Sequence, residues 1–139
     1  MRKKIALLLI SLLAVSNMNV LAANKNFSFT FRDNSSIPSA LGRAKKGADG
    51  DKFAYITPQI VTMNNVTSNM TITNAKINTR VRTNDAQHAT FLCPLQYGYG
   101  RYTVQYQSGR AVSNAYYLLY GNVESASKYP VYLNGVWCP

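Results

Sequence analysis

Short segments in which hydrophobic and polar residues alternate recur along this chain, and they constrain its fold most. Residues 26–32 read NFSFTFR, with three phenylalanines on one parity and polar side chains on the other. Residues 101–107 and 131–138 follow the same rule. Successive side chains of a β-strand point to opposite faces of a sheet, so each segment predicts a strand with one buried face. No heptad or other helical repeat competes with this pattern.

Further segments rich in β-branched and aromatic residues lie between these. They are 53–57 and 60–62, separated by Pro58, then 66–83 with a change of parity near Asn74, 88–93, and the hydrophobic run 115–123. The sequence therefore predicts a single all-β domain of about seven strands, an antiparallel β-sandwich or a small barrel.

Two connections are also predicted from composition. Residues 33–51 are rich in glycine and basic residues and predict a long surface loop, with room for one short helical turn over 39–45. Residues 108–110 (Ser-Gly-Arg) predict a hairpin loop, since three residues containing glycine commonly join paired strands.

Residues 1–22 have the three parts of a secretory signal peptide. Basic residues come first, an apolar run of eleven follows over 5–15, and small residues end the segment, so cleavage is expected after Ala22 or, as the next choice, Ala23. Eleven apolar residues are too few to span a bilayer, which needs about 20. We therefore expect residues 23–139 to form one secreted domain, extracellular or periplasmic.

The charge balance points to anionic partners. Lys and Arg number 15 against five Asp and Glu, a formal charge of +10, of which +7 remains once the signal segment is removed. Basic surfaces that carry aromatic residues bind polyanions. Six candidate contacts lie in two groups, one in the expected loop and one on a strand face: Arg43, Lys45 and Lys46, then Lys76, Arg80 and Arg82. The alternative is that this charge only keeps the protein soluble.

The two cysteines, Cys93 and Cys138, end predicted strands, and each precedes a proline. In an oxidising compartment two cysteines most simply form one disulfide, which we expect here. The alternative is a reactive thiol beside His88, but residues five apart in a strand face opposite sides.

Composition argues against catalysis and metal binding. The chain has one His and five carboxylates, four of them in expected loops, and no G-x-S-x-G motif. Asp49-Gly50-Asp51 matches only the beginning of a calcium loop, and neighbouring lysines would repel a cation. We expect no enzyme activity, no metal and no cofactor.

Tyrosine is the most frequent aromatic residue, with ten copies. Tyrosines supply large amphipathic contact areas at low entropic cost, so Tyr97, Tyr99, Tyr116 and Tyr117 are candidates for contact with a protein receptor.

A secretion signal, an NFSFTF-like first strand, a basic glycine-rich segment and a final aromatic strand together resemble the layout of small secreted proteins of Gram-positive bacteria. Among these are the lactococcin-972-like bacteriocins. The resemblance covers much of residues 23–139 and implies a secreted β-sandwich that interferes with cell-wall synthesis.

Two functions are therefore expected. The first is a bacteriocin-like protein that binds an anionic envelope component, such as a polymer or a lipid headgroup, with nucleic acid not expected as a partner. The second is an adhesin, matrix or inhibitor-type module that binds a protein through tyrosine-rich loops.

Overall fold

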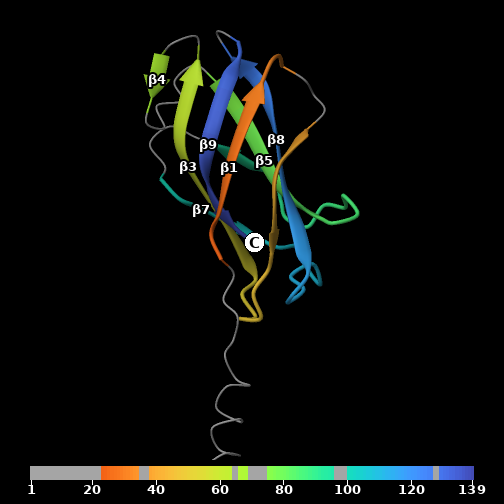
Figure 1. Cartoon of the computed structure of the whole chain (residues 1–139). Coiled ribbons are helices and arrows are strands. Elements are labelled where there is room, and N and C mark those ends of the chain that lie inside the picture. Colours follow the sequence, from red (N-terminus) through yellow and green to blue (C-terminus); the bar gives the residue numbers. More distant parts are fainter. Residues whose placement is uncertain (1–22, 35–37, 64–65, 69–74, 96–99, 127–128) are drawn as a thin grey trace, which may run out of the picture.

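The computed structural model describes residues 23–34, 38–63, 66–68, 75–95, 100–126 and 129–139. Within these ranges the chain is all-β, with nine strands in two antiparallel sheets that form a β-sandwich (Figure 1). The predicted fold class is confirmed, although the strands exceed the expected seven. No helix long and apolar enough to cross a membrane occurs among the described residues. The expected signal segment, residues 1–22, lies outside them.

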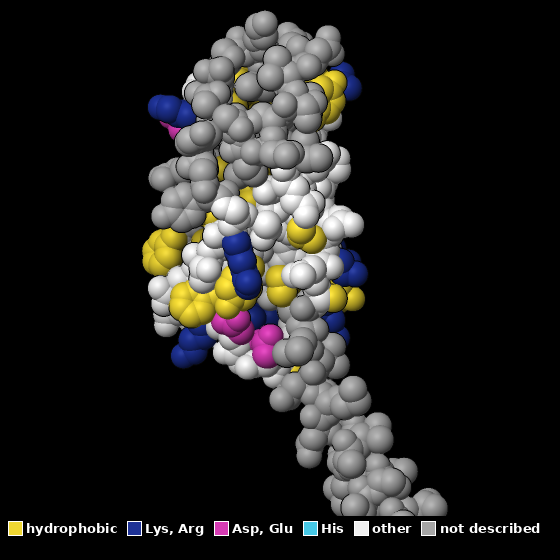
Figure 2. All heavy atoms as spheres, turned by 90° about the vertical axis from the view of Figure 1, so that its left-hand side faces the viewer, with side chains coloured by type: hydrophobic (Ala, Val, Ile, Leu, Met, Phe, Trp, Pro, Cys, Tyr) yellow, Lys and Arg dark blue, Asp and Glu magenta, His cyan; other side chains and the backbone are white. Residues whose placement is uncertain are grey.

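The first sheet is built around β9 (Val131–Cys138), which pairs with β1 (Lys25–Phe31) on one side and β3 (Phe53–Met63) on the other. Both β4 (Val66–Ser68) and β7 (Tyr102–Gln105) pair with β3. Figure 2 shows the molecule from the side of β3, β4 and β7. Uncharged and hydrophobic side chains cover most of the described surface there, and acidic side chains lie together near its lower end.

The second sheet is built around β8 (Tyr116–Ala126), which covers most of the hydrophobic run 115–123. It pairs with β2 (Ser39–Lys45) on one side and β5 (Ala75–Thr83) on the other, and β6 (Cys93–Leu95) pairs with the far side of β5. Of the expected strand over 88–93, only isolated bridges at His88 and Thr90 precede β6.

The core lies between the inner faces of the two sheets. In the last strand, Val131, Leu133 and Trp137 are buried, as the alternation in 131–138 predicted. Gly135 lies on the same face of the strand, and the Phe27 ring packs against it. A Cβ at Gly135 would lie 2.7 Å from Phe27 Cζ and 2.6 Å from the Thr57 carbonyl oxygen. Glycine at this position therefore lets β1 pack closely against β9.

The prediction of a surface loop over 33–51 is wrong in its middle, because residues 39–45 form β2. The pairing of β2 with β8 shifts register between Ala40 and Gly42, so Leu41 and Ala44 are both buried although they are three residues apart. A bulge of this kind adds one residue to a strand and removes its simple alternation. Residues 39–45 therefore lack the alternation of a strand, and their glycine and basic residues suggested a loop.

Two other connections also differ from expectation. Pro58 does not divide two strands, because β3 continues through it with a register shift between Pro58 and Ile60. A bulge accommodates a residue that cannot donate to the ladder. Residues 108–110 form a turn, but the strands on either side, β7 and β8, belong to different sheets. The turn is therefore a crossover and not a hairpin loop.

The structure contradicts the expected Cys93–Cys138 disulfide, because the two cysteines are not joined. Cys93 is buried on the inner face of the second sheet, opposite Thr79. Cys138 pairs with Tyr55 in the first sheet and has the parity opposite to the buried Trp137, which places it on the outer face. A disulfide requires Cβ atoms about 4 Å apart, which an inner and an outer face of different sheets do not provide.

Candidate functional site

The outward side of β5 carries three of the predicted basic contacts. Ile77, Thr79 and Val81 are buried, so the alternate residues Lys76, Arg80 and Arg82 point away from the core. This is the arrangement that the alternation in 66–83 predicted.

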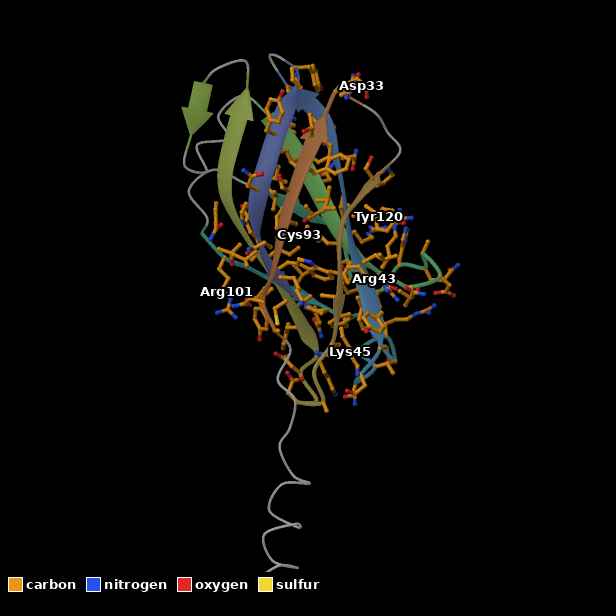
Figure 3. The ribbon with its side chains drawn as sticks, in the orientation of Figure 1. Asp33, Arg43, Lys45, Cys93, Arg101 and Tyr120 are labelled. Carbon is orange, nitrogen blue, oxygen red and sulfur yellow. The ribbon has the colours of Figure 1, made fainter. Side chains whose placement is uncertain are left out.

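Strand β2 brings two more basic residues to the same surface. Arg43 and Lys45 are exposed, and β2 lies beside β8. Leu118 of β8 is the register partner of both Arg43 and Arg82, so the two arginines lie in one row across three strands. We call this surface the basic face, and it comprises Arg43, Lys45, Arg80, Arg82, Tyr116, Leu118 and Tyr120. In Figure 3, Arg43, Lys45 and Tyr120 lie together on the right of the sandwich, and Arg101 lies on the opposite side.

Two arginine–tyrosine stacks order the basic face. The guanidinium carbon of Arg43 lies 4.1 Å from the centroid of the Tyr116 ring, and that of Arg82 lies 4.5 Å from the centroid of Tyr120. The Nε of Arg43 also donates to Asn84 Oδ1 at 3.1 Å. Each stack contributes about 0.5–1 kcal/mol at an exposed site. The stacks hold flat cationic groups over β8 while leaving their edges available to a ligand.

Arg80 is held differently, against the imidazole of His88. Its Nη1 lies 2.8 Å from Nδ1 and 3.1 Å from Nε2 of that ring, so a guanidinium proton faces an unprotonated ring nitrogen. Loss of hydration, and then the charges of Arg80 and Arg82, hold the pKa of His88 below its ordinary value. The ring is therefore neutral near pH 7 and gains charge only at lower pH.

Carboxylates do not neutralise this surface. The one side-chain ion pair among the described residues joins Lys46 to Asp49, away from the basic face. Asp85, in the turn after β5, accepts the hydroxyl of Thr83, and this hydrogen bond is the main cause of its lowered pKa. Glu124 accepts from Asn78 at 3.4 Å, nearer the other end of β5. The arginine charges thus remain available to an anion.

The structure does not gather every predicted contact on the basic face. Lys76 is exposed on the same side of β5, but four residues from Arg80, or about 13 Å along the strand. Lys46 is only 1% exposed. Its Nζ lies 3.6 Å from Asp49 Oδ1 and 5.4 Å from the Tyr106 ring centroid, so Lys46, directly after β2, is buried and does not belong to the basic face.

The predicted tyrosine contacts also separate. Tyr116 is 47% exposed and belongs to the basic face, whereas Tyr117 is 1% exposed and packs against Tyr106 with ring centroids 5.1 Å apart. Its hydroxyl donates to the Arg110 carbonyl and accepts from the Val112 amide at 2.8 Å. Tyr117 therefore supports the core and cannot contact a receptor. Tyr97 and Tyr99 lie outside the described residues.

Sequence reasoning missed Leu118 and Tyr120 of the basic face, and also His88, which contacts Arg80 beside it. The signal for Tyr120 is present, because alternation through 115–123 places Tyr116, Leu118 and Tyr120 on one face. No local signal pairs His88 with Arg80, since their contact depends on the bridge between Arg82 and His88.

Among the described residues no group of three or more His, Cys, Asp or Glu side chains could hold a metal ion. Comparisons with protein-family models, with curated proteins and with solved structures find no match.

Proposed function

We propose that this protein binds an anionic component of the cell envelope through its basic face and acts by binding, without catalysis. The observation that carries the proposal is that Arg43, Lys45, Arg80 and Arg82 share one sheet face with Tyr116 and Tyr120. Cations attract a polyanion, and aromatic rings offer stacking or sugar contact beside them. The expected export of the chain makes an envelope component a more suitable partner than nucleic acid.

The placement of charge supports binding over a merely solubilising role. Net charge keeps a protein soluble wherever the charges lie, so solubility does not require four cations on one sheet. Nor does it require arginines stacked on tyrosines.

A bacteriocin-like action is part of this proposal. The β-sandwich agrees with what the resemblance to small secreted bacteriocins implies, and envelope binding is the first step of such an action. Growth inhibition of neighbouring strains by the purified protein is the expected result.

The direct test is binding to inorganic polyphosphate, used as a soluble polyanion probe, at increasing salt. We expect affinity to fall steeply with salt, and Arg82→Gln to weaken binding about fivefold, which corresponds to about 1 kcal/mol for one cation near an anionic surface. Arg101→Gln is the matched control, because Arg101 also stacks on a tyrosine, with its guanidinium carbon 4.1 Å from the Tyr55 centroid, but lies beside the first sheet. Equal losses in the two variants would contradict the proposal.

A further inference from the structure

A small depression lies on the basic face between β5 and β8. Asn78, Arg80, Arg82, Tyr120 and Asn122 line it, and its volume is about 40 Å³. A volume of this size holds about three groups as large as a water molecule, which is similar to the space that the free oxygens of one phosphate group occupy.

Two of the arginines that line this depression each carry a donor without a partner among the described residues. The Nε atoms of Arg80 and Arg82 are buried, and neither has a hydrogen-bond partner in the described part of the chain. A buried donor without an acceptor is unfavourable, whereas an oxyanion would supply acceptors to both. Guanidinium groups match the geometry of phosphate and are weakly hydrated, so they suit a partly buried anion site.

One large hydrophobic side chain, Leu92, lies exposed beside these cations, and its neighbour in the chain, Phe91, is also exposed. Phe91 is 60% exposed and Leu92 is 50% exposed, and Leu92 also lines the depression. A soluble polymer offers no apolar environment to such a pair. The boundary between lipid headgroups and acyl chains does, and adjacent cations favour an anionic leaflet.

We infer that the depression holds the phosphate of an anionic phospholipid headgroup while Phe91 and Leu92 enter the membrane interface. This inference rests on the proposed function and narrows its ligand to a lipid surface. Arg80 and Arg82 bind the phosphate, and Tyr120 supports Arg82 from below.

The experiment measures sedimentation of the purified protein with phosphatidylcholine vesicles, prepared with and without phosphatidylglycerol. We expect binding only when phosphatidylglycerol is present. Phe91→Ser/Leu92→Ser should weaken it about tenfold or more through lost apolar burial, while binding to inorganic polyphosphate stays unchanged. Arg82→Gln should weaken both.

Phe53→Ser is the matched hydrophobic control, because Phe53 is 39% exposed in the first sheet, away from the depression. It should leave vesicle binding unchanged. Since Phe91 and Leu92 are exposed, their substitution should preserve the fold, which an amide spectrum verifies.

The outcomes separate the two proposals. Polyphosphate binding without vesicle binding, or a Phe91→Ser/Leu92→Ser variant that binds vesicles like the wild type, overturns the lipid inference and leaves the proposed function standing. If the wild-type protein shows no salt-sensitive binding to either polyphosphate or vesicles, both proposals are overturned.

Discussion

The two sheets of this sandwich have similar inner faces and different outer faces. Inward, both carry aromatic and aliphatic residues, such as Phe27 and Trp137 in the first and Ile77 and Leu119 in the second. Outward, the positions of β1 and β9 hold mainly Asn, Ser and Thr with Tyr132 and Val136, and Ser28 donates to Asn134 at 2.7 Å. The outer positions of β2, β5 and β8 hold the basic face.

This difference separates what folding requires from what it leaves free. A sandwich needs one buried face per sheet, and either kind of outer face satisfies that requirement. The fold therefore does not require the cations of the second sheet, which the proposed function assigns to binding a ligand.

The largest effect is expected from removing four cations from the basic face, compared with a control that loses the same number of cations elsewhere. A variant with Arg43→Gln, Lys45→Gln, Arg80→Gln and Arg82→Gln should lose about 10²–10³-fold in affinity for polyphosphate, at about 1 kcal/mol for each cation. A control removes four exposed cations elsewhere: Lys25→Gln, Arg32→Gln, Lys52→Gln and Arg101→Gln. It should lose far less. Similar losses would mean that only net charge matters.

The next test compares a glycine in each sheet. Gly135→Ala places a Cβ 2.6 Å from a backbone oxygen and 2.7 Å from Phe27, so it should lower the free energy of unfolding by about 1–3 kcal/mol. At Gly121 the closest atom, at 2.8 Å, is Leu41 Cδ1, the movable end of a side chain, although the Asn78 carbonyl oxygen lies at 3.2 Å. Gly121→Ala should therefore cost less. Denaturant unfolding measures both, and a larger loss at Gly121 would contradict this account of the packing.

A smaller effect is expected from the tyrosines. Tyr120→Leu removes the ring beneath Arg82 and should weaken polyphosphate binding by a factor of about 2 to 5, from a stack of about 0.5–1 kcal/mol. Tyr55→Leu removes the ring beneath Arg101 and should leave binding unchanged. Calorimetric titration distinguishes the two, and the idea fails if Tyr55→Leu is the more harmful.

The smallest effect concerns pH. Because the folded-state pKa of His88 is lowered, protonation below that pKa adds a cation beside Arg80 and Arg82, and polyphosphate binding should tighten as pH falls. Stability should change in the opposite direction. The unfolded chain binds the His88 proton at higher pH, so this residue's contribution to stability is present above the unfolded pKa and is lost as pH falls from there through the folded-state pKa. His88→Gln should remove the pH dependence of binding, as a titration from neutral to mildly acidic pH would show.

The sequence supplied much of the sandwich but only part of the site. Alternation correctly placed Trp137 inside and Arg80 and Arg82 outside, because side-chain direction in a strand is a local property. It failed at β2, where the register shift beside Leu41 hides the alternation. It also could not place Arg43 beside Arg82, since strand order is set by packing across the whole chain.

The local sequence pattern also could not predict which sheet a residue joins or whether it faces the interior. Cys93 and Cys138 each end a predicted strand, but nothing nearby in the sequence shows that one faces inward and the other outward in different sheets. Lys46 continues a basic run, yet it turns into the interior beside Asp49.

One measurement tests the central claim most directly, a map of amide and arginine side-chain NMR shifts on addition of inorganic polyphosphate at moderate salt. The account predicts that the largest shifts fall on the outward residues of β2, β5 and β8, including Arg43, Arg82 and Tyr120, with His88 moving alongside them. Shifts concentrated on the first sheet, or spread evenly over all exposed cations, would contradict it.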